Sequence, residues 1–427
     1  MFHFRTYRRS YEHYHLDEAR PSAAESAAAT GPASLPARRA RLVSGRFALV
    51  LMSSFGALTS FYLLLSVTPM YAVSAGAGNA GAGLVTAVLM LTCVAAAFAA
   101  PALMRRYGNR MVFALGALLL GGPALALLAP DRMYTIVAVS LVRGIGFGLN
   151  TVVTGALVAT VLPRERRGEG LGLAGVVSCV PAVVALPSGV WLADNTSYGV
   201  VIVITAVAAL APLAATPWLP GAAGHDDAAT TAGSEQPAGL LDGLRRGGQL
   251  RPSLVFAATT VSAGVIVAFL PLAVGADGSV AAAGLFAQAA TATLGRWVAG
   301  RLGDRHGHAS LLIPGLVIAA IGMTLLIWVA TPAAVITGMC LFGAGFGACQ
   351  NATFALMIDR VPASGYGTAS ALWNLAYDAG YGAGPAVFGL FVASTGYPAA
   401  FALTGLLMLA ALAPAWRERA AGVGGPR

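Results

Sequence analysis

The chain has 427 residues, of which 57% are hydrophobic and only 10% are charged, and its mean hydropathy is +0.74. Soluble globular domains carry about a quarter charged residues, so this composition excludes an ordinary soluble protein and indicates one embedded in a membrane. The net charge of +9 follows from the sidedness of the arginines described below and does not indicate nucleic-acid binding.

Twelve apolar stretches follow one another along the chain, each long enough for a helix to cross the hydrocarbon layer in about 20 residues. The predicted spans are 47–73, 80–104, 111–129, 133–160, 170–192, 199–219, 252–274, 280–301, 309–330, 333–357, 366–393 and 397–416. The sequence therefore predicts an all-α membrane protein with twelve transmembrane helices.

The stretches outside the spans predict the domain organisation. Residues 1–45 are polar and rich in Ala, Pro and Arg, without the short apolar core of a signal peptide, so we expect a disordered cytoplasmic tail. Residues 220–251 are rich in Gly, Ala, Ser, Thr and acids, as is typical of a flexible linker. This linker separates two six-helix halves, 46–219 and 252–416, and residues 417–427 form a second cytoplasmic tail.

The positive charges lie on one side of the predicted membrane. The chain contains no lysine, and apart from Arg132, Arg143 and Arg296 every arginine lies in a terminus or in alternate loops. Because basic residues accumulate on cytoplasmic loops, both termini are predicted to be cytoplasmic. We expect a multi-pass protein of the inner (plasma) membrane.

The two halves repeat each other when the chain is shifted by 199 residues. The segment LMRRYGNR from Leu103 then falls on LGDRHGHA from Leu302, and GIGFG from Gly144 falls on GAGFG from Gly343. Because one register holds without a gap across separate loops and spans, the halves are predicted to be six-helix pseudo-repeats.

Two motifs resemble those of the major facilitator superfamily. GRLGDRHG, residues 300–307, is similar to the loop signature between the second and third helices of a half, and RGIGFG from Arg143 is similar to the fourth-helix Arg-Gly motif. The resemblance spans about 47–416 and implies two parallel six-helix halves around a central site, open to each side in turn. In the first half the signature is degenerate, because Pro101 and Arg105 replace its glycine and aspartate.

The resemblance also implies a cytoplasmic gate at these loops. Asp304 alone supplies the acid of the signature, and it is expected to pair with Arg305, Arg301 or a base across the interface, unless it only caps the following segment. The residues assigned to the gate are Gly300, Asp304, Arg305, Gly307, Arg106 and Gly108.

Two ionisable residues lie deep within predicted spans. A charge at the bilayer centre costs at least about 2.5–3.5 kcal/mol on insertion scales, so such a residue usually faces a polar cavity. Asp378 is the only charged residue between Tyr366 and Ser394, and Arg143 lies near the middle of its span. We predict that Asp378 couples transport by carrying a proton or the charge of the cargo, with Arg143 responding to it. The alternative is a hydrogen-bonded acid that serves helix packing. Arg296 lies nearer a helix end and is expected to reach the membrane interface.

Aromatic and polar residues around Asp378 predict a lined cavity. On a helix, Asn374 and Tyr381 share the face of Asp378, and Trp373 and Tyr377 form the adjoining stripe. Such walls suit an organic substrate, although helix packing is an alternative for aromatic residues at this spacing. On other spans, the polar residues predicted to line the site, with interhelical hydrogen bonding as the alternative, are Asn150, Gln288 and Gln350.

A glycine and proline pattern follows Asp378. Gly380, Gly384 and Pro385 predict a close helix approach and a hinge. The pattern resembles the G-x-x-x-G-P motif of antiporters in the superfamily, but those carry it on the fifth helix and this chain carries it on the eleventh.

Together these features predict a secondary active transporter. We expect proton-coupled efflux of an amphipathic organic compound such as an antibiotic or metabolite, and a proton-coupled importer of a sugar or small organic acid is the alternative. No P-loop or catalytic constellation is present in the sequence, so we predict no enzyme. We expect a monomer whose partners are its small-molecule cargo, protons and lipid, and which binds no nucleic acid.

We also expect no cofactor and no metal site. His306 and His308 stand on a short loop without a further ligand nearby in the sequence. The four cysteines lie within spans without metal-ligand spacing and are interpreted as packing residues.

Overall fold

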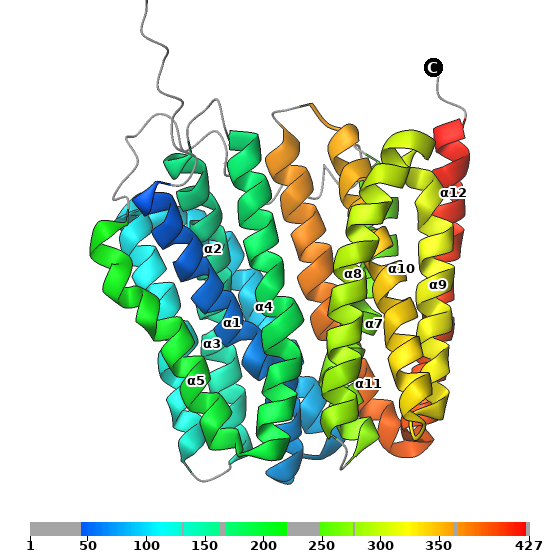
Figure 1. Cartoon of the computed structure of the whole chain (residues 1–427), viewed down its shortest axis with the longest axis horizontal. Helices are drawn as coiled ribbons and strands as arrows, with labels where there is room; N and C mark the ends of the chain where they lie inside the picture. The colour runs from blue at the N-terminus through cyan, green and yellow to red at the C-terminus, as the bar shows by residue number, and fades with distance from the viewer. Residues whose placement is uncertain are drawn as a thin grey trace, which may run out of the picture. The chain divides into compact units, whose positions relative to one another are not determined.

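Helices make up almost all of the part of the chain that the computed structural model describes (Figure 1). The described residues are 44–129, 132–162, 167–219, 248–275, 278–362 and 365–423. All of them belong to one compact unit, Leu42–Arg427. No strand occurs among these residues. The predicted tail before residue 44 and most of the predicted linker, 220–247, lie outside the described residues.

The first half begins and ends in helix. Its elements are α1 (Gly45–Ser74), α2 (Gly78–Gly121), the 3-10 helix η1 (Gly122–Leu128), α3 (Met133–Val161), α4 (Arg167–Asn195), α5 (Tyr198–Leu210) and the 3-10 helix η3 (Ala211–Trp218).

The second half follows the same plan. Its elements are α7 (Leu250–Val274), α8 (Gly278–His306), η4 (His308–Leu311), α9 (Leu312–Leu325), η5 (Leu326–Trp328), α10 (Pro332–Asp359), α11 (Tyr366–Leu409) and α12 (Leu412–Val423).

Local sequence signals start several of these helices. The Ser44 hydroxyl accepts a hydrogen bond from the Phe47 amide at 3.2 Å, and Ser197 caps α5 in the same way. Pro332 stands at the first position of α10, where its missing amide hydrogen costs nothing.

The long helices account for the twelve predicted crossings. By length and composition, nine helical stretches among the described residues could cross a membrane, and two of them, Gly78–Leu128 and Tyr366–Ala420, have 51 and 55 residues. At about 1.5 Å per residue, each of these two is long enough for two crossings. Helix α8 has 29 residues but is less apolar because of its Gly, Ala, Thr and Gln content. The all-α membrane fold is confirmed.

The sharp turns within the long helices fall on glycines. Gly108 interrupts α2 with φ +79°, and Gly396 interrupts α11 with φ +75°. Gly307, which lies 199 residues after Gly108, also has a positive φ of +82°. Because residues other than glycine rarely adopt this conformation, the repeated glycine fixes the same turn in both halves.

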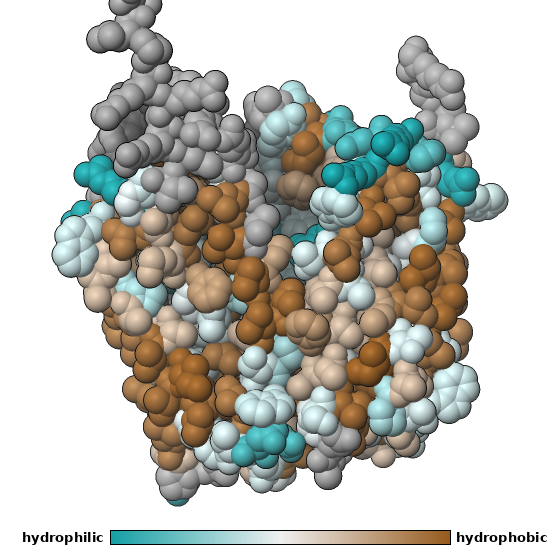
Figure 2. Space-filling model, in the orientation of Figure 1, coloured by the Kyte–Doolittle hydropathy of each residue, from teal (hydrophilic) through white to brown (hydrophobic). Residues whose placement is uncertain are grey.

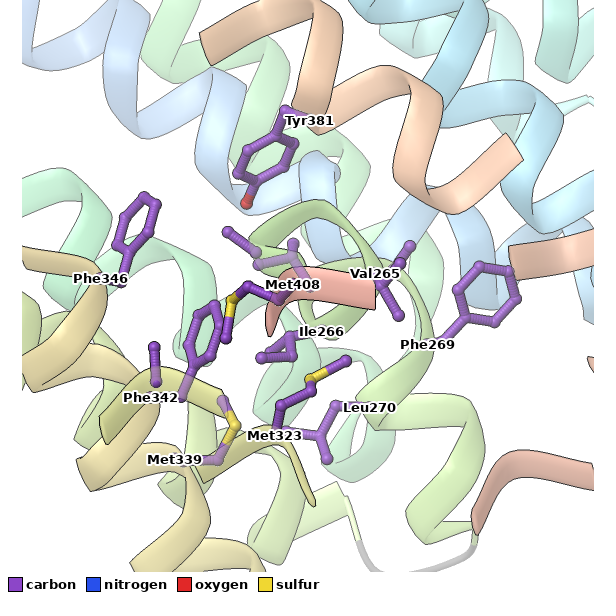
Figure 3. Packing of buried hydrophobic residues seen from close by; sticks show 14 of the residues in the cluster. Val265, Ile266, Phe269, Leu270, Met323, Met339, Phe342, Phe346, Tyr381 and Met408 are labelled. Carbon is purple, nitrogen blue, oxygen red and sulfur yellow. The ribbon is translucent and has the colours of Figure 1, made fainter. Parts of the chain in front are cut away.

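The halves meet mainly through two pairs of helices, and α1 also packs against α7. Within each half the helices pack closely, for example α2 against α3 and α8 against α10. Between the halves, α2 packs against α11 and α4 packs against α8. In the second half, apolar side chains from α7, α9, α10 and α11 interlock around Ile266 and Met323 (Figure 3).

The two ends of the helices differ. At the end where α1 begins, which we call the arginine end because it carries Arg46, Arg106, Arg305 and Arg360, the surface is hollowed between the halves (Figure 2). At the opposite end the halves touch. There the Tyr397 hydroxyl donates to Asn79 Oδ1 at 2.7 Å. The structure is therefore open at the arginine end and closed at the other.

Close backbone packing reinforces the closed end. A Cβ atom on Gly83 of α2 would collide with the Pro385 carbonyl of α11, and a Cβ on Gly278 of α8 would collide with Asp194 of α4. Glycine at these positions therefore lets the halves approach closely.

Candidate functional site

Asp378 lies at the contact between the halves. It is half-buried in α11, and its Oδ2 accepts a hydrogen bond from the Cys93 thiol of α2, with 3.7 Å between the sulfur and the oxygen. Among the described residues, no arginine or histidine lies within ion-pair distance of this carboxylate. The thiol is a weak donor, so Asp378 holds a weak partner across the interface and lacks a compensating cation.

Three tyrosines gather beside Asp378. Tyr377 and Tyr381 of α11 stack with their ring centroids 5.4 Å apart. Tyr62, on α1 of the first half, lies within electrostatic range of both of them and of Asp378. We call Tyr62, Tyr377 and Tyr381 the tyrosine group. It brings both halves to the same place as the acid.

Arg296 lies near two residues of the same group. It is half-buried in α8, and its Nη2 donates to the Cys179 sulfur of α4 at 3.3 Å. Tyr62 and Tyr377 lie within electrostatic range of Arg296 as well as of Asp378. The expectation that Arg296 reaches the membrane interface is therefore wrong, because its side chain turns to the α4 and α8 contact.

The two thiol contacts are related by the internal repeat. Cys179 lies 199 residues before Asp378, so the two occupy equivalent positions on α4 and α11. Cys179 contacts α8, and Asp378 contacts α2, which is the equivalent of α8 in the first half. The interpretation of Cys93 and Cys179 as packing residues is therefore incomplete, since each contacts a charged group of the other half.

Arg143 has different partners from those expected. Its side chain is 2% exposed, and it donates from Nη1 to the Leu120 carbonyl at 2.6 Å and from Nη2 to the Ser60 carbonyl at 3.0 Å. It thereby joins α3 to α2 and α1 within the first half. The structure does not bring Arg143 to Asp378, and the coupling role of Arg143 stays a prediction.

The aromatic residues of the predicted lining are held by the second half. Trp373 stacks on Phe256 of α7, with ring centroids 4.4 Å apart, and its Nε1 donates to Thr353 Oγ1 of α10 at 3.2 Å. Tyr381 is 4% exposed and points towards the apolar cluster of Figure 3. It therefore does not share an open face with Asp378, because α11 packs tightly at that level.

The polar residues of the predicted lining are scattered. Asn374 is exposed and donates to the Ser370 carbonyl of its own helix at 2.9 Å. Asn150 is 2% exposed, because α3 packs against α2 beside it, and its Oδ1 accepts from Thr154 at 3.1 Å. The expectation that Asn150 lines an open site is therefore wrong in this conformation. Gln288 is buried between α8 and α10, and Gln350 is half-buried on α10.

The predicted gate residues lie at the arginine end without a contact between the halves. The Asp304 side chain is 77% exposed, and Oδ1 lies 3.7 Å from His308 Nε2. Arg305 is exposed, and Arg106 lies over the Tyr107 ring at 5.3 Å. No partner of Asp304 on the first half is among the described residues, as expected where this end is open. Gly300 lies beside Asn351 of α10, and Gly108 and Gly307 make the turns described above.

The predicted hinge residues pack helices together. Cβ atoms on Gly380 and Gly384 would collide with Thr260 and with the Val261 carbonyl of α7. Pro385 lies inside α11, which keeps helical φ and ψ angles there and departs from them only at Gly396. A hinge movement at Pro385 remains a prediction.

Sequence reasoning missed Tyr62, Cys93, Cys179 and Arg296 as parts of the site. Neither cysteine nor tyrosine is conspicuous in an apolar span. The position of Arg296 near a helix end predicts that its side chain reaches the membrane interface and not the site. The repeat offers one usable signal, because Cys179 falls on the position of Asp378.

Comparisons with known proteins agree with this architecture. The family model described as Major Facilitator Superfamily matches residues 50–287 and 252–424. Among curated proteins, none matches the chain significantly.

Similar solved structures share the fold at low identity. A D-xylose-proton symporter is 18% identical, with a TM-score of 0.70, and the match covers 87% of this chain and 97% of that chain. The nucleoside transporter NupG is 13% identical, with a TM-score of 0.67 and coverage of 88% and 99%. A POT family transporter in complex with 5-aminolevulinic acid is 12% identical, with a TM-score of 0.69 and coverage of 87% and 96%.

Proposed function

Because the chain belongs to the major facilitator superfamily, we propose that it is a secondary active transporter that exchanges a proton for an amphipathic organic compound at Asp378. The family and the fold are those of transporters. The proposal concerns the coupling residue, the cargo and the direction. In this proposal the arginine end of the protein faces the cytoplasm.

One observation carries the proposal, the position of Asp378. A carboxylate within a membrane-spanning helix usually faces the interior and marks a substrate or proton pathway. Asp378 lies in a span without other charge, at the contact of α2 and α11, with only the Cys93 thiol as its described hydrogen-bond partner. It is therefore available to a proton or to a cationic group of the cargo.

The surroundings of Asp378 fit an exchange. The titratable groups that face it are the Cys93 thiol of α2, the Tyr62 hydroxyl of α1 and the Tyr377 hydroxyl of its own helix. None of these is a cation, so the carboxylate can be neutralised by a proton or by the cargo in turn. The α7 residues beside this part of α11, Phe256 and Thr260, add no charge.

Contact between the halves links this exchange to movement. Cys93 and Asp378 belong to different halves, so their hydrogen bond must break when α2 and α11 separate. Rocking of the halves about a central site would then expose Asp378 to each side in turn.

The aromatic rings of Tyr62 and Tyr377 near Asp378 support export of an amphipathic compound. The second candidate is uptake together with a proton, as named for the D-xylose-proton symporter of the same fold. The two candidates differ in the direction of cargo movement when a proton gradient is imposed.

A growth and accumulation assay tests the proposal. An efflux-deficient bacterium would express the wild type or Asp378→Asn and be challenged with diverse toxic organic compounds, with and without a protonophore. We expect the wild type to lower the accumulation of at least one compound, and both the protonophore and Asp378→Asn to abolish this effect.

The matched control is Asp359→Asn, which removes an exposed acid at the end of α10 and should behave as the wild type. Transport by Asp378→Asn at the wild-type rate would contradict the coupling role. Protonophore-sensitive accumulation in place of exclusion would select uptake.

A further inference from the structure

Arg296 is a cation with few hydrogen-bond partners and no ion-pair partner among the described residues. Its described hydrogen bond goes to the Cys179 sulfur, a weak acceptor, although a guanidinium carries five N–H donors. Among the described residues no carboxylate forms an ion pair with it. A half-buried guanidinium in a membrane span is costly unless it is paired, so this position calls for an anionic partner.

Three other arginines of the described chain have partners of other kinds. Arg143 donates to two backbone carbonyls, and Arg110 donates to the Leu219 carbonyl. Arg301, about one and a half turns after Arg296, lies over the Trp297 ring at 3.8 Å. Arg296 differs from all three in having only a thiol.

The fold itself does not require an arginine there. The residue 199 positions earlier, at the equivalent place on α2, is Ala97. A small side chain therefore suffices for helix packing at this position, and the arginine is an addition in one half only.

Arg296 and Asp378 lie at different helix contacts but near the same tyrosines. Arg296 lies at the contact of α4 and α8, and Asp378 lies at the contact of α2 and α11. Tyr62 and Tyr377 lie within electrostatic range of both. Opposite charges thus lie near the same two tyrosines, at two different contacts between the halves, and neither has a counter-ion among the described residues.

We propose that the cargo is an organic zwitterion, with its anionic group bound by Arg296, its ammonium group bound by Asp378 and its apolar body against Tyr62 and Tyr377. This rests on the proposed function, because the ammonium displaces the proton from Asp378. A cation alone would leave Arg296 unpaired, and an anion alone would lie near the unpaired carboxylate of Asp378. Only a zwitterion pairs both charges.

Equilibrium binding to the purified full chain in lipid nanodiscs tests this without any proton gradient. The first set of probes is the dipeptide phenylalanylphenylalanine, its methyl ester, its N-acetyl form and the form capped at both ends. The second set is the same four forms of phenylalanine, in which the two charges lie closer together. We expect one zwitterion to bind at least tenfold more tightly than each of its capped forms.

Variants assign each charge to its residue. Arg296→Gln should weaken binding of the zwitterion at least tenfold and leave the methyl ester unchanged. Asp378→Asn should weaken the zwitterion and the ester and spare the N-acetyl form. Arg296→Lys keeps the charge and should retain most of the zwitterion affinity, which separates a charge effect from misfolding. Arg301→Gln, on the same helix and held by Trp297, is the matched control and should bind as the wild type.

Two outcomes of the binding experiment overturn the proposal. One is that neither zwitterion binds more tightly than its doubly capped form, and the other is that Arg296→Gln binds the zwitterion as well as the wild type does. The proposed function fails in a separate experiment, if the Asp378→Asn variant still exports a compound and the protonophore still abolishes that export. Export of esters but not of zwitterions would leave proton exchange in place and refute the zwitterion.

Discussion

At the scale of single residues, the two deeply placed charges of the chain have opposite environments. Arg143 is enclosed and donates to the carbonyls of two neighbouring helices. Asp378 is half-buried and faces a thiol and tyrosine hydroxyls. The first arrangement holds helices in place, whereas the second leaves the Asp378 carboxylate without a cationic partner among the described residues.

Arg143→Ala is expected to destabilise the first half. It removes two charge-assisted hydrogen bonds, each worth roughly 1.5–3 kcal/mol, so we expect a loss of about 3 kcal/mol in the free energy of unfolding after the relief of a buried charge. Arg143→Lys keeps the charge and one donor direction and should lose about half as much. Thermal unfolding of the purified protein in detergent measures both. Equal stability of the alanine variant and the wild type would show that the two bonds contribute nothing.

Asp378 could be found from the sequence because a lone acid in an apolar span is conspicuous. Arg143 could be found for the same reason, but its partners could not, because backbone carbonyls carry no sequence signal. The sequence indicates Cys93 and Cys179 only as packing residues. A thiol forms a hydrogen bond to a charged group only where the fold brings such a group next to it, and the sequence does not show this. The site is therefore predictable only in part, because Asp378 and Arg143 stand out in the sequence, whereas the place of Arg296 and the neighbours of these charges do not.

At the scale of helices, glycines decide where two backbones meet. Gly384 lies against α7, and Gly83 lies against Pro385 of the other half. The sequence pattern predicted close approach at 380 and 384 without identifying the partner helix. The predicted spans place residues 108 and 307 in equivalent loops, and the positive φ of both glycines explains why the residue recurs.

Gly83→Val is expected to hinder closure of the end opposite the arginine end. Its side chain would collide with the Pro385 carbonyl when α2 and α11 meet there. We expect faster maleimide labelling of a cysteine introduced by Asn79→Cys, because that position leaves its contact with Tyr397. Gly155→Val is the control, since nothing lies within 4 Å of a Cβ at that position. Unchanged labelling in both variants would argue that the closed end tolerates the extra volume.

At the scale of the whole molecule, the all-α membrane fold was predictable from the hydropathy of the chain, and the internal repeat agreed with it. Which end is open was not predictable, because the same sequence must support both states. Contacts among the last elements were also not predictable. Arg360, after α10, pairs with Glu418 of α12 and donates to the Gly248 carbonyl at 2.6 Å before α7.

This junction is expected to stabilise the second half. Glu418 is 1% exposed, so Arg360→Ala leaves a buried carboxylate unpaired and should cost about 3–5 kcal/mol. Glu418→Ala should cost less, because Arg360 keeps its bond to Gly248. The double variant should be more stable than the sum of the single losses predicts. Additive losses in a double-mutant cycle of thermal unfolding would show that the pair is not coupled.

A disulfide between the halves is expected to stop transport. Gly278 and Asp194 approach so closely that cysteines introduced by Gly278→Cys and Asp194→Cys fall near bonding distance. Oxidation should lock the closed end, and reduction should restore transport of the same compound. Each single variant is the control, because neither can form this bridge. Full transport by the oxidised double variant would mean that this end need not open.

The lone position of Asp378 limits the concentration ratio of cargo that proton exchange can sustain. Among the described residues it is the only acid near the middle of a span, so an exchange at this carboxylate moves one proton per cycle. One charge crossing 100 mV releases about 2.3 kcal/mol, which sustains a concentration ratio of roughly 50-fold for a cargo without net charge. Steeper ratios would require a larger membrane potential or an added pH difference. The steady concentration ratio of the cargo in vesicles, followed as the potential is varied, would thus count the protons that Asp378 carries.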